Sequence, residues 1–140
     1  MLFGLIVLLV LTSLMPCAQA ATLTVTVENV PSDDGRLLVY ICDEGGYKEQ
    51  VCKTRSSVPA QPGRITLAIE DVSAGQWGLW VLHDKNDNGK MDFRWFGPPK
   101  EAYGNSNNPP PRRGPAYWED IVFDVVEEDL ALSIRLKGAR

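Results

Sequence analysis

The chain has 140 residues, with 14 Lys and Arg against 18 Asp and Glu residues, and its net charge is −4. This length is enough for one domain and too short for two. The sequence contains no long basic run that could neutralise nucleic-acid phosphates, which argues against DNA or RNA as a partner. We therefore expect a single domain whose partner is not a nucleic acid.

The first 20 residues have the pattern of a secretory signal peptide. Residues 2–14 are almost entirely apolar, but this run is shorter than the roughly 20 apolar residues that cross a bilayer. Pro16 and a small-x-small sequence at 18–20 follow it, as at a signal-peptidase site. We expect cleavage after Ala20, export to the periplasm or the extracellular space, and a mature domain of residues 21–140 without a membrane span. Cys17 leaves a lipoprotein signal as an alternative, although Pro16 fits that pattern poorly.

Cleavage after Ala20 would leave two cysteines, Cys42 and Cys52, in an oxidising compartment. A bridge between them would close a loop of about 11 residues, which contributes roughly 2.7 kcal/mol in the chain-entropy model. Residues 43–50 between them are polar and have the composition of an exposed loop. We predict a disulfide, with two buried free thiols as the alternative.

Short alternating or apolar segments separated by Gly and Pro predict an all-β fold. The expected strands are residues 22–27, 36–42, 64–70, 76–83, 119–125 and 130–136. Residues 76–83 are apolar on both faces, so we expect this strand in the middle of a sheet that is covered on both sides. No segment has a helical period long enough for three turns. The pattern predicts a two-sheet sandwich of about seven short strands.

One long segment, residues 96–115, interrupts this regularity with six prolines. Loops of this length without secondary structure are usually functional or disordered. We expect Trp95, Phe96 and Tyr103 to anchor the first half against the domain, and residues 105–113 to be mobile.

Residues 84–92 have the spacing of a calcium-binding loop. Such a loop needs oxygen ligands at alternate positions and a sharp turn at the sixth, where Gly89 falls. The candidate ligands in this segment are Asp84, Asn86, Asn88, Lys90 through its backbone carbonyl, and Asp92. We predict a structural calcium site there.

The segment departs from the EF-hand pattern, since its twelfth position is Trp95 instead of Glu and no helices flank it. Glu101 is a candidate for the missing carboxylate if residues 98–99 fold back. With so few carboxylates the affinity should be modest, about 10⁻⁴ to 10⁻³ M. The alternative is a metal-free hairpin with a type I′ turn at Asn88 and Gly89.

Two longer motifs contain this loop: residues 73–92, SAGQWGLWVLHDKNDNGKMD, and residues 96–108, FGPPKEAYGNSNN. They resemble the motifs aGxYxxxxxHDxNxNGxxD and GxPkExYGfSNN of the exported bacterial family catalogued as domain of unknown function 2141. The resemblance implies export and a transthyretin-like or immunoglobulin-like sandwich, and it implies no activity. The chain departs from the family pattern at Trp77, Pro98 and Asn105, all outside the Asp84 loop.

Catalytic signals are few. His83 is the only histidine, and no Ser lies in a Gly-x-Ser-x-Gly turn. We expect His83 to end a strand and to brace the loop by hydrogen bonding. A hydrolase that uses His83 is therefore the least favoured function.

A binding module is the favoured function, because loops on small sandwiches commonly carry binding sites. Its candidate ligand surface for a glycan, a peptide or an envelope protein is aromatic: Trp95, Phe96, Tyr103 and Trp118. The alternative for these side chains is ordinary core packing. A second function is a cell-envelope structural or assembly protein that pairs through an edge strand. Binding predicts exposed aromatics beside the loop, assembly predicts an uncovered edge strand of low charge, and an enzyme would need His83 in a pocket.

Overall fold

The computed structural model describes residue 15 and residues 19–138. Most of the predicted signal peptide, residues 1–20, and Cys17 with it, lies outside the described residues and stays a prediction. No helix in the described part of the chain is long and apolar enough to span a membrane.

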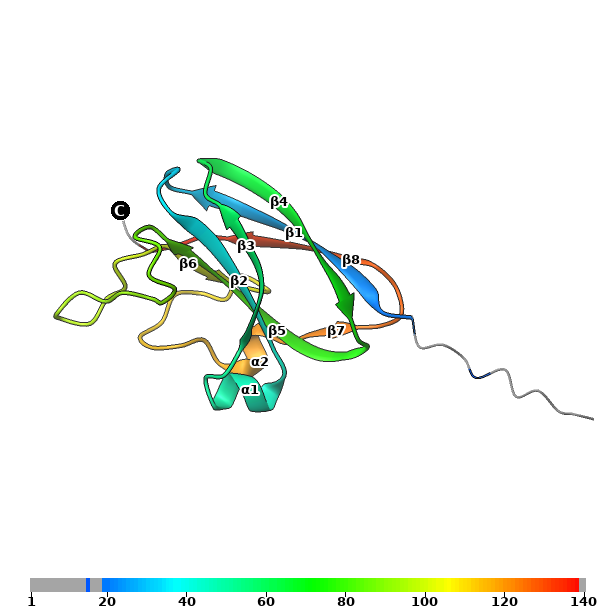
Figure 1. Ribbon diagram of the computed structural model, residues 1–140. Helices are drawn as coiled ribbons and strands as arrows, with labels where there is room; N and C mark the ends of the chain where they lie inside the picture. The colour runs from blue at the N-terminus through cyan, green and yellow to red at the C-terminus, as the bar shows by residue number, and fades with distance from the viewer. Residues whose placement is uncertain (1–14, 16–18, 139–140) are drawn as a thin grey trace, which may run out of the picture.

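The fold is all-β, as predicted, and consists of two packed sheets (Figure 1). The first sheet has three strands in the order β4-β1-β8, with bounds β1 (Ala21–Val30), β4 (Gly63–Val72) and β8 (Leu130–Arg135). The second has five strands, in the order β3-β2-β5-β6 with β7 also paired to β5. Their bounds are β2 (Arg36–Cys42), β3 (Lys53–Pro59), β5 (Gly75–Asp84), β6 (Tyr103–Asn105) and β7 (Phe123–Val125).

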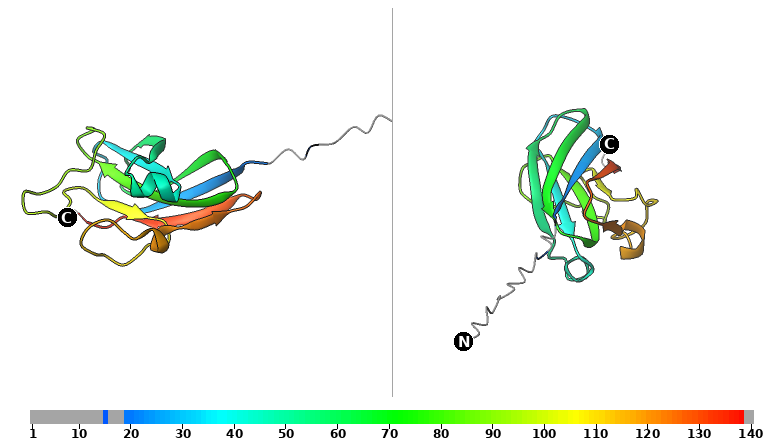
Figure 2. Two further views of the ribbon diagram at one scale, coloured as in Figure 1. Left: turned by 90° about the horizontal axis from the view of Figure 1, so that it is seen from below. Right: turned by 90° about the vertical axis from the view of Figure 1, so that its right-hand side faces the viewer.

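The core lies between the sheets and follows from the period-two alternation of the strands. In β1, Leu23, Val25 and Val27 are fully buried, whereas the threonines between them lie on the outer face. From the opposite sheet, Val39 and Val81 are equally buried in the same cluster. The left view in Figure 2 shows the two sheets as layers.

β5 lies in the middle of its sheet, as its apolar sequence predicts. It pairs with β2 along one edge and with β6 and β7 along the other. Leu79 and Val81 face the core, and Leu82 on the other face is fully buried too. A short helix, α2 (Trp118–Ile121), packs on that outer face at Gly78, where an added Cβ would lie 2.9 Å from both Trp118 and Ile121.

Two parts of the pattern were predicted wrongly. Two strands were not among those expected: β3, whose side chains are mostly exposed because it is an edge strand, and β6, which lies within the proline-rich segment. Residues 119–125 were expected to be one strand, but they divide into α2 and β7. Trp118 and Ile121 lie three residues apart, and a helical turn brings both onto Gly78.

The predicted disulfide is confirmed, because Cys42 and Cys52 are bonded with their Cα atoms 4.9 Å apart. The loop between them contains a one-turn helix, α1 (Glu44–Lys48), with no buried residue. Asp43 caps this helix by accepting the N–H of Gly46 at 2.7 Å. The polar sequence is therefore an exposed loop, as expected, with a capped helical turn inside it.

Gly35 lets the β1–β2 turn pass directly under the end of β5. Its φ is +67°, and a Cβ there would meet the carbonyl oxygen of Asp84 well inside contact distance and the backbone of Lys85 at 2.8 Å. Gly63 also has positive φ, +94°, but an added Cβ would meet nothing within 4 Å.

We expect Gly35→Ala to lower the free energy of unfolding by about 3 kcal/mol, because left-handed strain and a backbone clash act together. Gly63→Ala should cost only the strain, about 1–2 kcal/mol. Urea unfolding of both variants measures the difference. Equal losses would contradict the close approach of the turn to Asp84.

Candidate functional site

The loop that follows β5 is organised by the carboxylate of Asp84. This side chain is fully buried at the end of the strand. Its two oxygens accept the N–H groups of Asn88 at 3.1 Å and Gly89 at 2.7 Å. The fifth and sixth positions of the loop are thus bonded back to the first.

The second carboxylate of the loop, that of Asp92, accepts hydrogen bonds from both asparagine side chains. One of its oxygens accepts Nδ2 of Asn86 at 2.7 Å and Nδ2 of Asn88 at 2.8 Å. The bond from Asn86, with smaller contributions from Asn88 and Lys90, holds the pKa of Asp92 below its ordinary value. Two amides and a carboxylate therefore meet at one point.

The side chain of Glu101, nine residues beyond Asp92, packs back against this loop. It is 3% exposed, and its carboxylate oxygens accept the N–H groups of Lys85 at 2.9 Å and Asp92 at 3.1 Å. The structure therefore brings Glu101 to the loop. It also brings together four of the other predicted ligand residues, Asp84, Asn86, Asn88 and Asp92.

The donor set decides which ion this loop could hold. Among residue 15 and residues 19–138, no group of three or more His, Cys, Asp or Glu side chains converges on one point. A cation would therefore need amide and carbonyl oxygens, including that of Lys90, beside the carboxylates, which is the chemistry of Ca²⁺. Positive φ occurs at Asp87 and Gly89 and not at Asn88, so the segment is no type I′ hairpin at Asn88 and Gly89.

Beyond Asp92 the chain forms a small hairpin, residues 92–100, which we call the aromatic hairpin. Hydrogen bonds from Lys100 N–H to Asp92 O and from Arg94 N–H to Pro98 O, both 2.8 Å, close it. The tip turns between Arg94 and Gly97, whose N–H donates to Arg94 O at 2.9 Å. Its three aromatic side chains are exposed: Phe93 58%, Trp95 95% and Phe96 58%.

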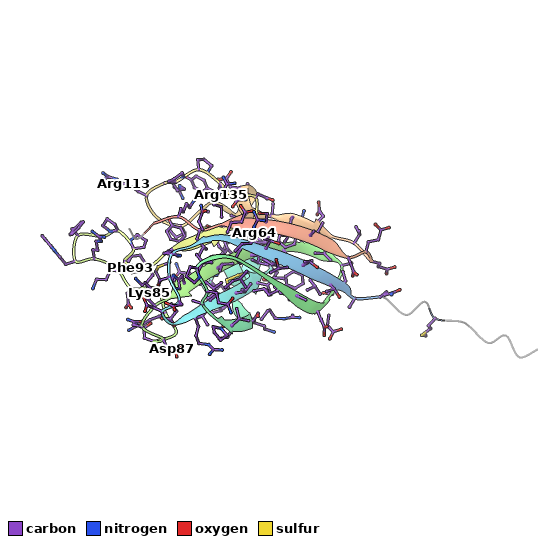
Figure 3. All side chains as sticks on the ribbon, turned by 90° about the horizontal axis from the view of Figure 1, so that it is seen from above. Arg64, Lys85, Asp87, Phe93, Arg113 and Arg135 are labelled. Carbon is purple, nitrogen blue, oxygen red and sulfur yellow. A yellow bond between two sulfur atoms is a disulfide. The ribbon has the colours of Figure 1, made fainter. Side chains whose placement is uncertain are left out.

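Trp95 and Phe96 therefore do not anchor the long loop, contrary to expectation. Tyr103 is half-buried in β6, and Trp118 is 8% exposed against Gly78. Of the four predicted surface aromatics, only Trp95 and Phe96 are strongly exposed. Figure 3 labels Phe93 of the same hairpin, near Lys85 and Asp87, at the end of the sandwich opposite to the start of β1.

Residues 106–108, which belong to the segment 105–113 that was expected to be mobile, are instead held by hydrogen bonds and form a clamp. Ser106 is fully buried, and its hydroxyl accepts Leu79 N–H at 3.1 Å. Asn107 donates to Val122 O at 2.8 Å. Asn108 donates to Ser133 O at 2.8 Å and accepts Arg135 N–H at 2.7 Å. The Ser-Asn-Asn motif thus joins β5, the start of β7 and β8. These polar residues suggest a loop in the sequence, and nothing in the sequence indicates the distant backbone groups to which they bond.

His83 is withdrawn from the surface. It is fully buried, and its Nε2 is 2.8 Å from Asp34 O in the β1–β2 turn. Nδ1 has no hydrogen-bond partner in the structure as described. The side chain thus braces the turn below the loop and reaches no solvent.

Fold and site together define a two-sheet β-sandwich whose distinctive feature is a carboxylate-organised loop that supports an exposed aromatic hairpin. The chain belongs to the bacterial family DUF2141, described as uncharacterized protein conserved in bacteria, which it matches over residues 25–133. The suspected family is therefore confirmed. No curated protein and no solved structure matches the chain.

We expect Glu101→Ala to lower the free energy of unfolding by about 2–3 kcal/mol, because two backbone N–H groups lose their shared acceptor. Trypsin should then cut faster after Lys90 and Arg94, since the base of the hairpin is released. Glu128→Ala, at an exposed site, should change neither property. Unchanged cleavage in Glu101→Ala would show that Glu101 does not hold the hairpin.

Proposed function

We propose that this protein is an exported, non-enzymatic binding module whose ligand contacts the aromatic hairpin, and whose Asp84 loop holds calcium as a structural ion. The ligand class is a component of the cell envelope: a glycan, a peptide or a protein. The single observation that carries the proposal is the exposure of Trp95 and Phe96 on a hairpin that is tied to the rigid sandwich through Asp92 and Glu101. Large apolar side chains at such a site generally mark an interaction surface.

The hairpin supports binding because it is held in place before any ligand arrives. Three backbone hydrogen bonds close it, and Glu101 joins its base to the end of β5. A preformed contact surface loses less conformational entropy on binding than a flexible one. The arrangement therefore favours recognition by residues 93–96.

The edge strands give less support to the alternative of assembly by strand addition. β3 carries Lys53, Arg55 and Pro59, and charges and proline on an edge oppose pairing with another chain. Along β8, Asn108 already bonds Ser133 O and Arg135 N–H. β4, the other edge of the first sheet, pairs only with β1 and carries no charge at residues 65–69, so strand addition at β4 is the form of assembly that the described strands leave open.

Calcium is supported by the two buried carboxylates of the loop. Asp84 is fully buried and Glu101 is 3% exposed, and neither forms an ion pair within the described residues. Buried anions without a cationic partner are costly. A bound Ca²⁺ would offset the charge of the loop, and the amide oxygens of Asn86 and Asn88 and the backbone carbonyl of Lys90 would complete the ligands that the carboxylates do not supply. The ion would then fix the base of the hairpin.

Thermal unfolding in about 5 mM calcium, in magnesium and in EDTA tests this site. For a dissociation constant of about 10⁻⁴ to 10⁻³ M, calcium should stabilise the folded protein by about 1–2 kcal/mol, which is a rise in Tm of several degrees. Asp92→Asn should abolish the rise. Asp87→Asn, with the same charge change in the same loop, should retain it. If the Tm of the wild type were the same in calcium and in EDTA, the ion site would be refuted.

Binding itself is tested on arrays of bacterial envelope glycans and peptides. The double variant Trp95→Ala/Phe96→Ala should lose about tenfold or more of the wild-type signal, because two large apolar contacts are removed. Val126→Ala, a substitution at another exposed apolar side chain (59%), should bind like the wild type. Equal binding by the double variant would place the contact surface elsewhere.

A further inference from the structure

The charge of the chain is unevenly distributed. Residues 85–117, which contain the aromatic hairpin, carry six Lys and Arg against three Asp and Glu, a net charge of +3 in a chain of net charge −4. Such asymmetry indicates that the partner of this end is anionic.

Most of the positive charge is free to meet a partner. Lys85 lies 3.9 Å from Asp34, but the other five basic side chains form no ion pair with any described residue: Lys90, Arg94, Lys100, Arg112 and Arg113. All five are exposed. The acidic Glu101 is buried and accepts backbone N–H groups, so it hardly counters them. Figure 3 labels Arg113 and Phe93 at the same end of the molecule.

The shape of the hairpin suits a soft surface better than a small ligand. Sites for small molecules are concave, whereas Trp95 is 95% exposed at the tip of a projecting loop (Figure 1). Its ring meets Phe96 edge-on, with centroids 5.4 Å apart and an interplanar angle of 84°. The pair therefore forms a projecting wedge. Exposed Trp with adjacent basic residues is typical of side chains at a membrane interface.

A hollow lies behind the wedge. It has a volume of about 320 Å³, and its lining is Arg94, Pro98, Pro99, Tyr103, Pro111, Lys137 and Gly138. Two cations and no acidic side chain line it. Lys137 lies with its Nζ 2.8 Å from Pro109 O, and partial burial lowers its pKa. An anionic group that entered the hollow would be attracted by both cations.

We propose that the aromatic hairpin docks this protein peripherally on the surface of bilayers that contain acidic phospholipids. Trp95 and Phe96 enter the boundary between headgroups and acyl chains, the surrounding Lys and Arg side chains face the lipid phosphates, and one acidic headgroup occupies the hollow. This inference rests on the proposed function, because it takes the hairpin as the contact surface. A free polyanion would use the basic residues but would leave the aromatic wedge in water.

The test uses protein purified after expression of the full 140-residue sequence, in EDTA, where calcium cannot bridge to lipid, and in parallel in about 5 mM calcium, where the proposed ion site is filled. Co-sedimentation should show binding to vesicles of about 3:1 phosphatidylcholine to phosphatidylglycerol and none to pure phosphatidylcholine. Brominated acyl chains should quench the fluorescence of the wild type. Trp95→Phe should lose this quenching while it still sediments with the vesicles.

Two further variants separate charge from insertion. Arg112→Gln/Arg113→Gln should weaken partitioning about 25-fold, at about fivefold per charge. The matched double variant Lys53→Gln/Arg55→Gln, on β3, should bind like the wild type. Trp95→Ser/Phe96→Ser should weaken partitioning at least about tenfold.

Equal binding to neutral and acidic vesicles, no binding to either, or wild-type partitioning of Trp95→Ser/Phe96→Ser would overturn the membrane proposal. Retention on immobilised heparin without vesicle binding would overturn it too, and would leave the binding module in place with a soluble polyanion as its ligand. Loss of the array signal in Trp95→Ala/Phe96→Ala alongside negative vesicle results would likewise preserve the proposed function.

Discussion

The buried carboxylate of Glu101 is the interaction on which the functional end of this protein depends. It accepts one N–H at the end of β5 and another at the base of the aromatic hairpin. An ionised group removed from water requires such charge-assisted bonds. Because the same side chain bonds Lys85 and Asp92, the loop between them is closed at both ends. The hairpin that follows Asp92 therefore leaves the sandwich in one direction.

A second set of polar contacts gives β6 its stability. β6 has only three residues, and Glu101 holds the chain before it while Ser106, Asn107 and Asn108 hold the chain after it. Short strands gain little from their own ladder bonds. Ser106 and Asn108 bond the backbone of β5 and β8, and Asn107 bonds Val122 at the end of α2, so this polar segment is part of the framework.

The β-sandwich could be predicted because burial between two sheets demands alternation, and residues 22–27 and 130–136 show it clearly. β5 could be placed in the centre because it is apolar on both faces. β3 could not be predicted, since an edge strand needs no apolar face and its letters are those of a loop. α2 was missed because its helical turn is favoured by contact with Gly78 on a distant strand, which local sequence does not encode.

The sequence by itself determined most of the longer strands, the cysteine pair, the spacing of polar residues from Asp84 to Asp92, and the family. All of these depend on the alternation of apolar and polar residues within a strand or on the spacing of particular residues along the chain. Only the tertiary structure decided that Trp95 and Phe96 are exposed while Trp118 is buried, because burial depends on which elements pack nearby. It also decided that Glu101 closes the loop and that Ser106 to Asn108 form a clamp, since their partners are backbone groups far away in the sequence.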